Sequence, residues 1–538
     1  MTLLKRNKLG VVTSGSLIDG LTARLEAHAS VEDMRVGQFV VIQGEKHEFF
    51  SMITDVVLEA TNQKVLTDPP NGDPFLHDVL AGTATYGTVN LSPRLMLPTN
   101  VGENLQPVKT IPRHFANVFE ANDQDFTRVF GQEGGLQFEI GRPLDMDVPV
   151  CINLERLVER SNGIFGKSGT GKSFLTRLLL CGTIYANVAS NLIFDMHSEY
   201  GWDSRSESGI FVKGLRQLFG DTVLVYTLDP DFSRQRRVDG TVLIGLDQIE
   251  VEDIISLQDE LNLNNTAAES SYLLVDRFKE NWLRELLNMD SEAIKEFAEQ
   301  AGAHTGALSA LKRKLSQVAR LNFIKDKADT SVVDRMIDAL AHGRHVVLEF
   351  GRHSAPRDYM LVANIITRRI HRRWIEQTEH YLHSKNEADR PRQLMITIEE
   401  AHRFLTPAIA RQTIFGRIAR EMRKYSVTLL VVDQRPSSID AEVMSQLGTR
   451  ITALLNDDKD IDAVFAGVSG SSGLKAVLAS LDSKQQALVL GHAVPMPVVV
   501  RTRAYDEALY KAVASSTLDV LSKPFAQVQA ETDELFPD

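Results

Sequence analysis

Residues 160–181, R-S-N-G-I-F-G-K-S-G-T-G-K-S-F-L-T-R-L-L-L-C, hold the strongest signal in the chain. Gly166, Gly171, Lys172 and Ser173 fit G-x-x-x-x-G-K-S/T, the pattern of a phosphate-binding loop. The glycines let consecutive backbone N–H groups point inward around an anion. The helix that follows adds the positive end of its dipole. The segment therefore predicts a site for a nucleoside triphosphate.

The flanks of this loop fit a strand before it and a helix after it. Ile164 and Phe165 end a short apolar run, and apolar residues recur at helical spacing over 173–181. In such loops the lysine reaches the β- and γ-phosphates and the serine hydroxyl binds Mg²⁺, roles that fall to Lys172 and Ser173. We expect ATP and Mg²⁺ as cofactors. The expected nucleotide-binding residues are Gly166, Lys167, Ser168, Gly169, Thr170, Gly171, Lys172, Ser173 and Phe174.

Length and composition indicate a multidomain protein without a membrane segment. The chain has 538 residues, of which 43% are hydrophobic and 24% charged. Two to four domains are expected at this length, and no apolar run approaches the roughly 20 residues of a membrane helix. Cys151 and Cys181 are its two cysteines and lack metal-ligand spacing. A cytoplasmic protein is the simplest interpretation, because the start has no signal-peptide pattern.

The net charge of the chain is −12 at pH 7. This charge argues against a protein coated in nucleic acid. It is compatible with a DNA motor whose basic residues are confined to a channel, because the local charge decides binding there.

The order of strand and helix signals predicts an α/β ATPase core with additions. Short β-rich runs dominate the first hundred residues and predict a small β-barrel, with helices expected over 16–27 and near Phe75. A later helical stretch lacks a chemical motif and could bind a partner or a neighbouring subunit. The expected domains are 1–110, N-terminal β-barrel; 111–150, connector; 151–249, first part of the core; 250–343, helical insertion; 344–505, second part of the core; and 506–538, C-terminal helix and acidic tail.

Two acids follow the apolar strand expected over 394–398. A strand that ends in acids downstream of a phosphate-binding loop is the Walker B pattern. One acid holds the Mg²⁺ shell, and the other orients or deprotonates the attacking water. We assign the first role to Glu399 and the second to Glu400.

Further polar residues follow two other predicted strands. Asp195 ends the strand 191–195, where an acid is well placed for the metal or a water, and Glu199 comes soon after it. Gln434 lies just beyond the strand 428–432. Its side chain is the candidate sensor of the γ-phosphate.

Two predicted helices are rich in arginine. The first, over 358–379, carries a cluster that we interpret as a solvated face or an interface rather than a DNA contact. The second, over 411–425, lies between the Walker B strand and the next strand. Its basic residues are Arg417, Arg420, Arg423 and Lys424.

Together these motifs resemble the HerA family of hexameric DNA translocases, relatives of the FtsK-type motors. The resemblance covers most of the chain and implies a RecA-like P-loop ATPase core behind the β-barrel, a homohexamer, ATP sites between subunits and double-stranded DNA as a partner. It rests on G-K-S-G-T-G-K-S (166–173), F-D-M-H-S-E-Y-G (194–201), I-E-E-A-H (398–402), I-A-R-E-M-R-K-Y (418–425) and D-Q-R-P (433–436).

The same resemblance implies that an arginine of one subunit completes the ATP site of the next. A cation supplied in trans stabilises the charge that develops on the γ-phosphate. Arg423 is the first candidate for this finger and Arg420 the second, while Arg160 could make another cross-subunit contact. The chain departs from the family pattern where glycine is frequent, at Met422 and Ser426, and where serine is frequent, at Asp433.

Relatives in this family work with a separate enzyme, either a NurA-like nuclease in DNA end processing or a nuclease or sirtuin-like effector in anti-phage defence. The sequence offers no nuclease metal cluster of its own. Two functions therefore stay open: an ATP-driven double-stranded DNA translocase or helicase, and a nucleotide-gated ring that assembles and activates a partner effector with little translocation. A conjugative pumping ATPase is less favoured, because the sequence holds no membrane segment.

Overall fold

The computed structural model describes residues 6–61, 85–98, 105–205, 211–229, 231, 237–329, 331–411, 413–468, 472–482 and 484–521. The chain divides into two compact units. The first comprises Met1–Asn153 with Thr452–Arg503, and the second Leu154–Ile451 with Ala504–Asp538. The helix expected near Phe75 and the acidic tail after residue 521 lie outside the described residues.

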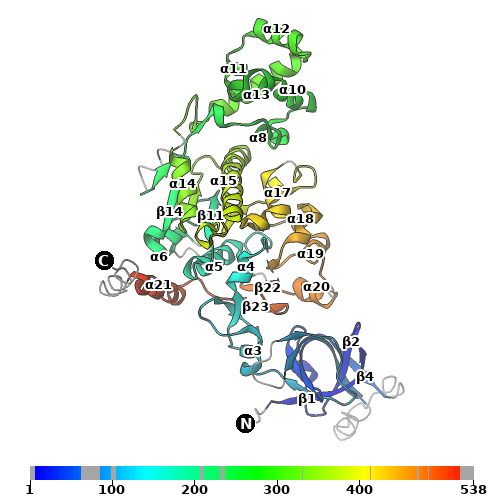
Figure 1. Cartoon of the computed structure of the whole chain (residues 1–538). Helices are drawn as coiled ribbons and strands as arrows, with labels where there is room; N and C mark the ends of the chain where they lie inside the picture. Colours follow the sequence, from blue (N-terminus) through cyan, green and yellow to red (C-terminus); the bar gives the residue numbers. More distant parts are fainter. Residues whose placement is uncertain are drawn as a thin grey trace. The chain divides into compact units, whose positions relative to one another are not determined.

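The first unit contains a closed β-barrel, drawn as a ring of strands in Figure 1. The strands follow the order β2-β1-β7-β3-β4-β5, and β5 pairs back onto β2, which closes the barrel. Alternate side chains fill its interior, among them those of Val40, Ile42 and Val89. The strands are β1 (Lys8–Ser16), β2 (Gly20–Leu25), β3 (Phe39–Gln43), β4 (His47–Ala60), β5 (Thr85–Pro98), the short β6 (Gln106–Pro107) and β7 (Asn117–Glu120).

The helix expected over 16–27 is wrong, because this segment forms the β1–β2 hairpin. Leu21, Ala23 and Leu25 are buried while the residues between them are partly exposed. This is the two-residue period of a strand with one face on a core. Gly20, at φ 91°, supplies the backbone conformation that lets the chain turn into β2.

The remaining strands of the first unit are antiparallel: β8 pairs with β9, and β23 pairs with both β8 and β22. The short helix α3 lies within the segment expected to be a connector, and Asn122 caps it. Helices α19 and α20 were not anticipated. The bounds are α3 (Asp123–Phe130), β8 (Gln137–Arg142), β9 (Val150–Asn153), α19 (Asp458–Val464), α20 (Ser472–Ala479), β22 (Gln486–Gly491) and β23 (Val498–Thr502).

The second unit is built on a sheet with the strand order β15-β14-β18-β11-β19-β20-β10-β21. The pairs from β15 to β10 are parallel. The central strands are buried throughout, as expected for a parallel sheet covered on both faces. The strands are β10 (Asn162–Phe165), β11 (Ser190–Asp195), β14 (Val223–Thr227), β15 (Gly240–Thr241), β18 (His345–Glu349), β19 (Leu394–Glu399), β20 (Val427–Asp433) and β21 (Thr449–Thr452).

Helices connect these strands, and two short two-stranded sheets, β12-β13 and β16-β17, also belong to the second unit. The helices are α4 (Leu154–Val158), α5 (Lys172–Tyr185), α6 (Leu215–Phe219), α14 (Ser331–Ala341), α15 (Pro356–Ser384), α16 (His402–Leu405), α17 (Ile414–Glu421), α18 (Ala441–Gln446) and α21 (Glu507–Leu521). The short strands are β12 (Ser204–Arg205), β13 (Phe211–Val212), β16 (Ile244–Gly245) and β17 (Ile324–Lys325). None of the helices described is long and apolar enough to cross a membrane.

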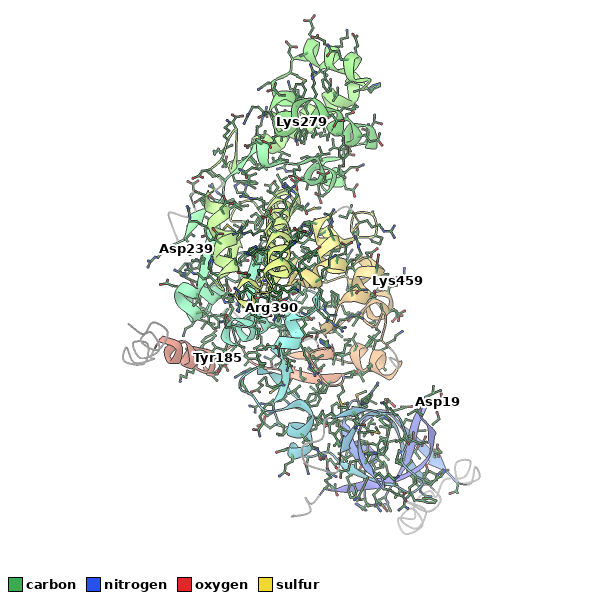
Figure 2. All side chains as sticks on the ribbon, viewed as in Figure 1. Asp19, Tyr185, Asp239, Lys279, Arg390 and Lys459 are labelled. Atoms are coloured by element: carbon green, nitrogen blue, oxygen red, sulfur yellow. The ribbon has the colours of Figure 1, made fainter. Side chains whose placement is uncertain are left out.

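A helical segment lies between β16 and β17 in the chain, and Figure 1 labels its helices α8, α10, α11, α12 and α13. Its helices α10, α11, α12 and α13 pack on one another, and Lys279, labelled in Figure 2, lies between α10 and α11. Trp282 anchors this segment because its indole N–H donates to the carbonyl of Ile249 at 3.0 Å. The helices are α8 (Val251–Ile255), α9 (Gln258–Leu261), α10 (Asn265–Phe278), α11 (Trp282–Asn288), α12 (Ser291–Ala301) and α13 (Thr305–Ala319).

The arginines of α15 are neutralised by acids of the same unit. Arg368 pairs with Asp253 at 2.6 Å and also with Glu250, which lies 2.8 Å from Arg372. Arg369 and Arg373 lie 2.5 Å and 3.8 Å from Asp334 and Asp338 of α14. These ion pairs join α15 to acids of α14 and of the segment around α8. The interpretation of the cluster as a solvated face or an interface stays a prediction.

A buried histidine makes the stability of the second unit depend on pH. His345 is 2% exposed, and its Nδ1 accepts the backbone N–H of Asn191 at 3.2 Å. Burial, with a smaller effect of the charge of Arg392, lowers the pKa of His345 to about 3. The unfolded chain binds a proton at this residue below pH ~6.5 and the folded chain does not, so stability is lost as the pH falls from ~6.5 toward 3.

We therefore expect His345→Asn to flatten the acid side of the stability profile. Asparagine keeps an acceptor near Asn191 but does not titrate. Between pH 7.5 and 5.5 the wild type should lose about 1 kcal/mol more unfolding free energy than the variant. Denaturant unfolding of both proteins at the two pH values measures this difference, and the other histidines cancel in the comparison. Equal losses would contradict the role given to His345.

Candidate functional site

The carboxyl ends of the parallel strands place the phosphate-binding loop and the acids at one edge of the sheet. Phe165, the last residue of β10, is in register with Asp433 at the end of β20. Glu399 ends β19, next to β20, and Asp195 ends β11 on the other side of β19. Because β20 alone separates β10 from β19, the loop and Glu399 are about 10 Å apart across the strands. This spacing leaves room for a phosphate chain between them.

The phosphate-binding loop joins β10 to α5 through glycines in the left-handed region. Gly169 has φ 78° and Gly171, which caps α5, has φ 92°. The carbonyl of Lys167 accepts the hydroxyl of Thr170 at 2.8 Å and the ammonium of Lys172 at 2.9 Å. The Lys172 ammonium therefore lies over the loop, where it can exchange this carbonyl for phosphate oxygens.

The Glu399 carboxyl is buried among other acids and two tyrosines. Its Oε1 accepts the Tyr200 hydroxyl at 2.7 Å, and its backbone N–H donates to the Tyr359 hydroxyl at 3.1 Å. Its Oε2 is buried and has no hydrogen-bond partner among the described residues. Burial, together with the negative charges of Asp195, Glu199 and Glu400, raises the pKa of Glu399 to about 8.

These surroundings fit a divalent cation. An unpartnered buried oxygen in a field of negative charge is what a hydrated Mg²⁺ would satisfy. Within the described part of the chain, no group of three or more His, Cys, Asp or Glu side chains could hold a metal ion by itself. The remaining ligands would have to be waters, nucleotide oxygens and the Ser173 hydroxyl, as is usual for Mg²⁺ bound with a nucleotide.

Asp195 is fully buried, and its oxygens are used within the chain. Oδ1 accepts the backbone N–H of Glu199 at 2.8 Å, and Oδ2 accepts that of Tyr200 at 2.8 Å. Its carboxylate thus shapes the loop that carries both residues and brings the Tyr200 hydroxyl onto Glu399. Sequence reasoning did not single out Glu349, which ends β18 in register with Asp195 and is also fully buried.

Glu400 lies in the left-handed region, at φ 48°, directly after β19. A residue other than glycine is uncommon there, and such strain is concentrated at functional sites. The Gln434 side-chain amide donates to Glu400 Oε1 at 2.9 Å. The structure therefore brings the residues expected to handle the water and the γ-phosphate into direct contact.

The candidate arginines lie away from this edge. Arg160 precedes β10, and Arg423 lies in the 3₁₀ turn Met422–Tyr425 that precedes β20. β20 spans seven residues, so the start of this strand is about 20 Å from its carboxyl end. Arg423 is exposed and has no side-chain partner among the described residues, whereas Arg420 donates to the carbonyl of Ala410 at 3.3 Å.

Several groups in contact with these residues were not predicted from the sequence. The two tyrosines on Glu399 come from the loop after β11 and from α15, and nothing in their local sequence indicates this contact. His402 stands in the quoted segment I-E-E-A-H but received no role. Its Nδ1 lies 2.9 Å from Asp433 Oδ2. The position of a histidine just after the paired acids was the available signal.

Comparisons with known proteins agree with this organisation. A family model described as "Helicase HerA, central domain" matches residues 138–370, and one described as "HAS barrel domain" matches residues 9–92. The chain is 23% identical over 445 residues to the "DNA double-strand break repair helicase HerA" of Pyrococcus furiosus, covering 76% of this chain and 77% of that protein.

The protein of the same name from Sulfolobus acidocaldarius is 23% identical over 513 residues, covering 93% of this chain and 94% of its own length. Among solved structures, VirB4 of Thermoanaerobacter pseudethanolicus matches 70% of this chain and 99% of its own, with a TM-score of 0.43 and 15% identity. The two matched domains occur in the order barrel and then ATPase core, and the similarity to the HerA proteins extends over most of the chain. Most of this chain is therefore similar to proteins named HerA, and its central part matches the model of the HerA helicase central domain.

Proposed function

We propose that this protein is an ATP-driven double-stranded DNA translocase or helicase that acts as a homohexamer with a separate effector enzyme. The observation that carries the proposal is the arrangement of one parallel sheet. The phosphate-binding loop and the acids Asp195, Glu399 and Glu400 occupy its carboxyl edge. Arg423, which has no side-chain partner among the described residues, precedes the first residue of β20 at the opposite edge. Relatives named as DNA double-strand break repair helicases support DNA as the substrate.

In this proposal the loop and α5 bind the triphosphate, and Lys172 neutralises its β- and γ-phosphates. Ser173 and Glu399 hold Mg²⁺, which supplies charge stabilisation at the phosphates when bound. Glu400 orients the attacking water and accepts its proton. Gln434, hydrogen-bonded to Glu400, senses the γ-phosphate. Asp195 shapes the loop that carries Tyr200 and thereby supports Glu399.

Arg423 is the proposed finger of the neighbouring site, with Arg420 as the second candidate and Arg160 as a further cross-subunit contact. Along β20 the start of the strand is about 20 Å from the site edge, farther than an arginine side chain reaches within its own chain. A ring in which the start of one β20 faces the next phosphate-binding loop would complete the site. Arginine suits this task because its guanidinium forms paired hydrogen bonds with phosphate oxygens.

We expect Arg423→Ala to leave the ring assembled but inactive in ATP hydrolysis, with a loss of roughly 10³-fold in turnover. Mixing it with Glu400→Gln subunits should restore some sites, because an intact Arg423 then faces an intact Glu400 across certain interfaces. Turnover of defined mixtures, with ring mass measured in the same buffer, tests this. Lys424→Ala, an exposed cation next in sequence, is the matched control. Mixed rings without recovery at any ratio would contradict a finger in trans.

The effector enzyme is proposed to be a NurA-like nuclease in DNA end processing, or a nuclease or sirtuin-like enzyme in anti-phage defence. The alternative function is a nucleotide-gated ring that scaffolds and activates such an effector with little translocation. The packed helical segment α10–α13, which contributes no residue to the site described above, favours this alternative as a place where a partner could dock.

Steady-state ATP hydrolysis of the purified protein, with and without linear double-stranded DNA, tests the proposal. Ring size should be measured by mass in the same buffer. A hexamer strongly stimulated by DNA supports the motor. A hexamer whose rate of hydrolysis does not change with DNA supports the scaffold. A protein that does not hydrolyse ATP contradicts the role of Glu400 in activating the attacking water.

A further inference from the structure

The turn after the Walker B strand is held by a buried carboxylate that takes no part in the proposed chemistry. Asp433 is 1% exposed. Its Oδ2 accepts the backbone N–H of His402 at 2.6 Å, and its Oδ1 accepts the backbone N–H of Arg435 at 2.7 Å. One side chain thus joins the turn that carries Glu400 to the turn that carries Gln434.

The His402 ring completes this arrangement. Nδ1 lies 2.9 Å from Asp433 Oδ2 and 3.7 Å from Glu400 Oε2. Because the acceptor is a carboxylate, Nδ1 carries the proton, and the ring is fixed in one orientation between two acids. The hydrogen bond with Asp433 raises the pKa of His402, against the opposing effect of burial.

Glu400 needs such support, because its backbone has a left-handed conformation that persists only where its surroundings enforce it. Among the described residues, the carboxylate of Glu400 has two side-chain neighbours: the Gln434 amide, which donates to Oε1, and the His402 ring, whose Nδ1 lies 3.7 Å from Oε2. Gln434 directly follows Asp433 in the chain, and the His402 ring is hydrogen-bonded to the Asp433 carboxylate.

We propose that His402, held by Asp433, is a positioning residue that aims the Glu400 carboxylate at the attacking water. This inference rests on the proposed ATP hydrolysis at the same site and assigns a role to the buried carboxylate of Asp433. His402 touches neither nucleotide nor water in this role. It acts through the direction of the Glu400 side chain.

The test first compares kcat and KM for ATP, nucleotide affinity and thermal stability in the wild type, His402→Ala, His402→Asn and Asp433→Asn. Alanine removes the donor that pairs with Asp433, and asparagine restores a donor near the position of Nδ1. We expect His402→Ala to lower kcat about 10- to 100-fold with KM and nucleotide affinity nearly unchanged, as a misdirected catalytic group predicts. His402→Asn should recover most of this loss.

The double variant of His402→Ala with Asp433→Asn should be no slower than the slower single variant, since both changes break one arrangement. His383→Ala, an exposed histidine of α15, is the control. Normal kcat in His402→Ala, beside an inactive Glu400→Gln, overturns the inference and leaves the proposed function intact. Parallel loss of kcat, affinity and stability without recovery in His402→Asn also overturns it. If the wild type does not hydrolyse ATP, both the proposed function and the role given to His402 are contradicted.

Discussion

Glu400→Gln is expected to bind ATP as the wild type does and to hydrolyse it at least roughly a hundredfold more slowly, because the residue that orients and deprotonates the water is lost. Glutamine has nearly the same size and can still accept from the Gln434 amide, which lies 2.9 Å from Glu400 Oε1. The ring and the nucleotide complex should therefore persist. Single-turnover hydrolysis and binding of a fluorescent ATP analogue separate the two effects.

The matched control is Glu379→Gln, which removes an equal charge from an exposed position of α15. Its turnover should match that of the wild type. Full turnover in Glu400→Gln would move the water-handling role to Glu399 or Glu199. Glu399 has a buried oxygen that accepts the Tyr200 hydroxyl, and Glu199 is half-buried. The turnover of Glu399→Gln and of Glu199→Gln would then show which of the two acids handles the water.

Lys172→Ala is expected to abolish hydrolysis, because the variant loses the cation that neutralises the β- and γ-phosphates during transfer, and to weaken nucleotide binding. The ammonium lies 2.9 Å from the Lys167 carbonyl, within the loop that would wrap the phosphates. A hydrogen bond between charged groups contributes about 1.5–3 kcal/mol, so the affinity for ATP should fall about 10- to 100-fold. Titration of a fluorescent nucleotide measures this, with turnover measured on the same preparations.

Lys295→Ala, on the exposed face of α12, controls for the loss of one positive charge. Its affinity and turnover should be unchanged. Because α5 packs on its neighbours through apolar residues such as Leu178 and Leu179, Lys172→Ala should also keep the thermal stability of the wild type. Unchanged turnover in a folded Lys172→Ala protein would contradict the assignment of the phosphate-binding loop.

The parts of the site that the sequence predicted are those fixed by local rules. The loop is recognisable from its glycines and lysine, and acids at the ends of parallel strands must meet at one edge of the sheet. The ATPase core and the barrel were predicted for the same reason, since alternation and short buried runs reveal strands. The helix expected over 16–27 is wrong because this segment has few apolar residues, and their spacing is compatible with a helix as well as with a strand. Pairing with β1 in the hairpin decides for the strand.

The rest of the site depends on contacts between distant segments. Tyr200 and Tyr359 reach Glu399 from chain positions about 200 and 40 residues away, and Asp433 reaches His402 across 31 residues. Neither contact leaves a local pattern. In the proposed ring, the phosphate that each candidate arginine would contact belongs to the neighbouring subunit, so no contact within one chain reveals the role of that arginine.

The ion pairs along α15 also affect how strongly the affinity of the protein for DNA would depend on salt concentration. Affinity for DNA falls with salt in proportion to the number of phosphates that cations neutralise, through counterion release. Arg368, Arg369, Arg372 and Arg373 are already matched by the chain's own acids and would release few counterions. The slope of log affinity against log salt should therefore reflect other cations, among them Arg411, Arg417 and Arg423, which are exposed and form no ion pair with any described residue.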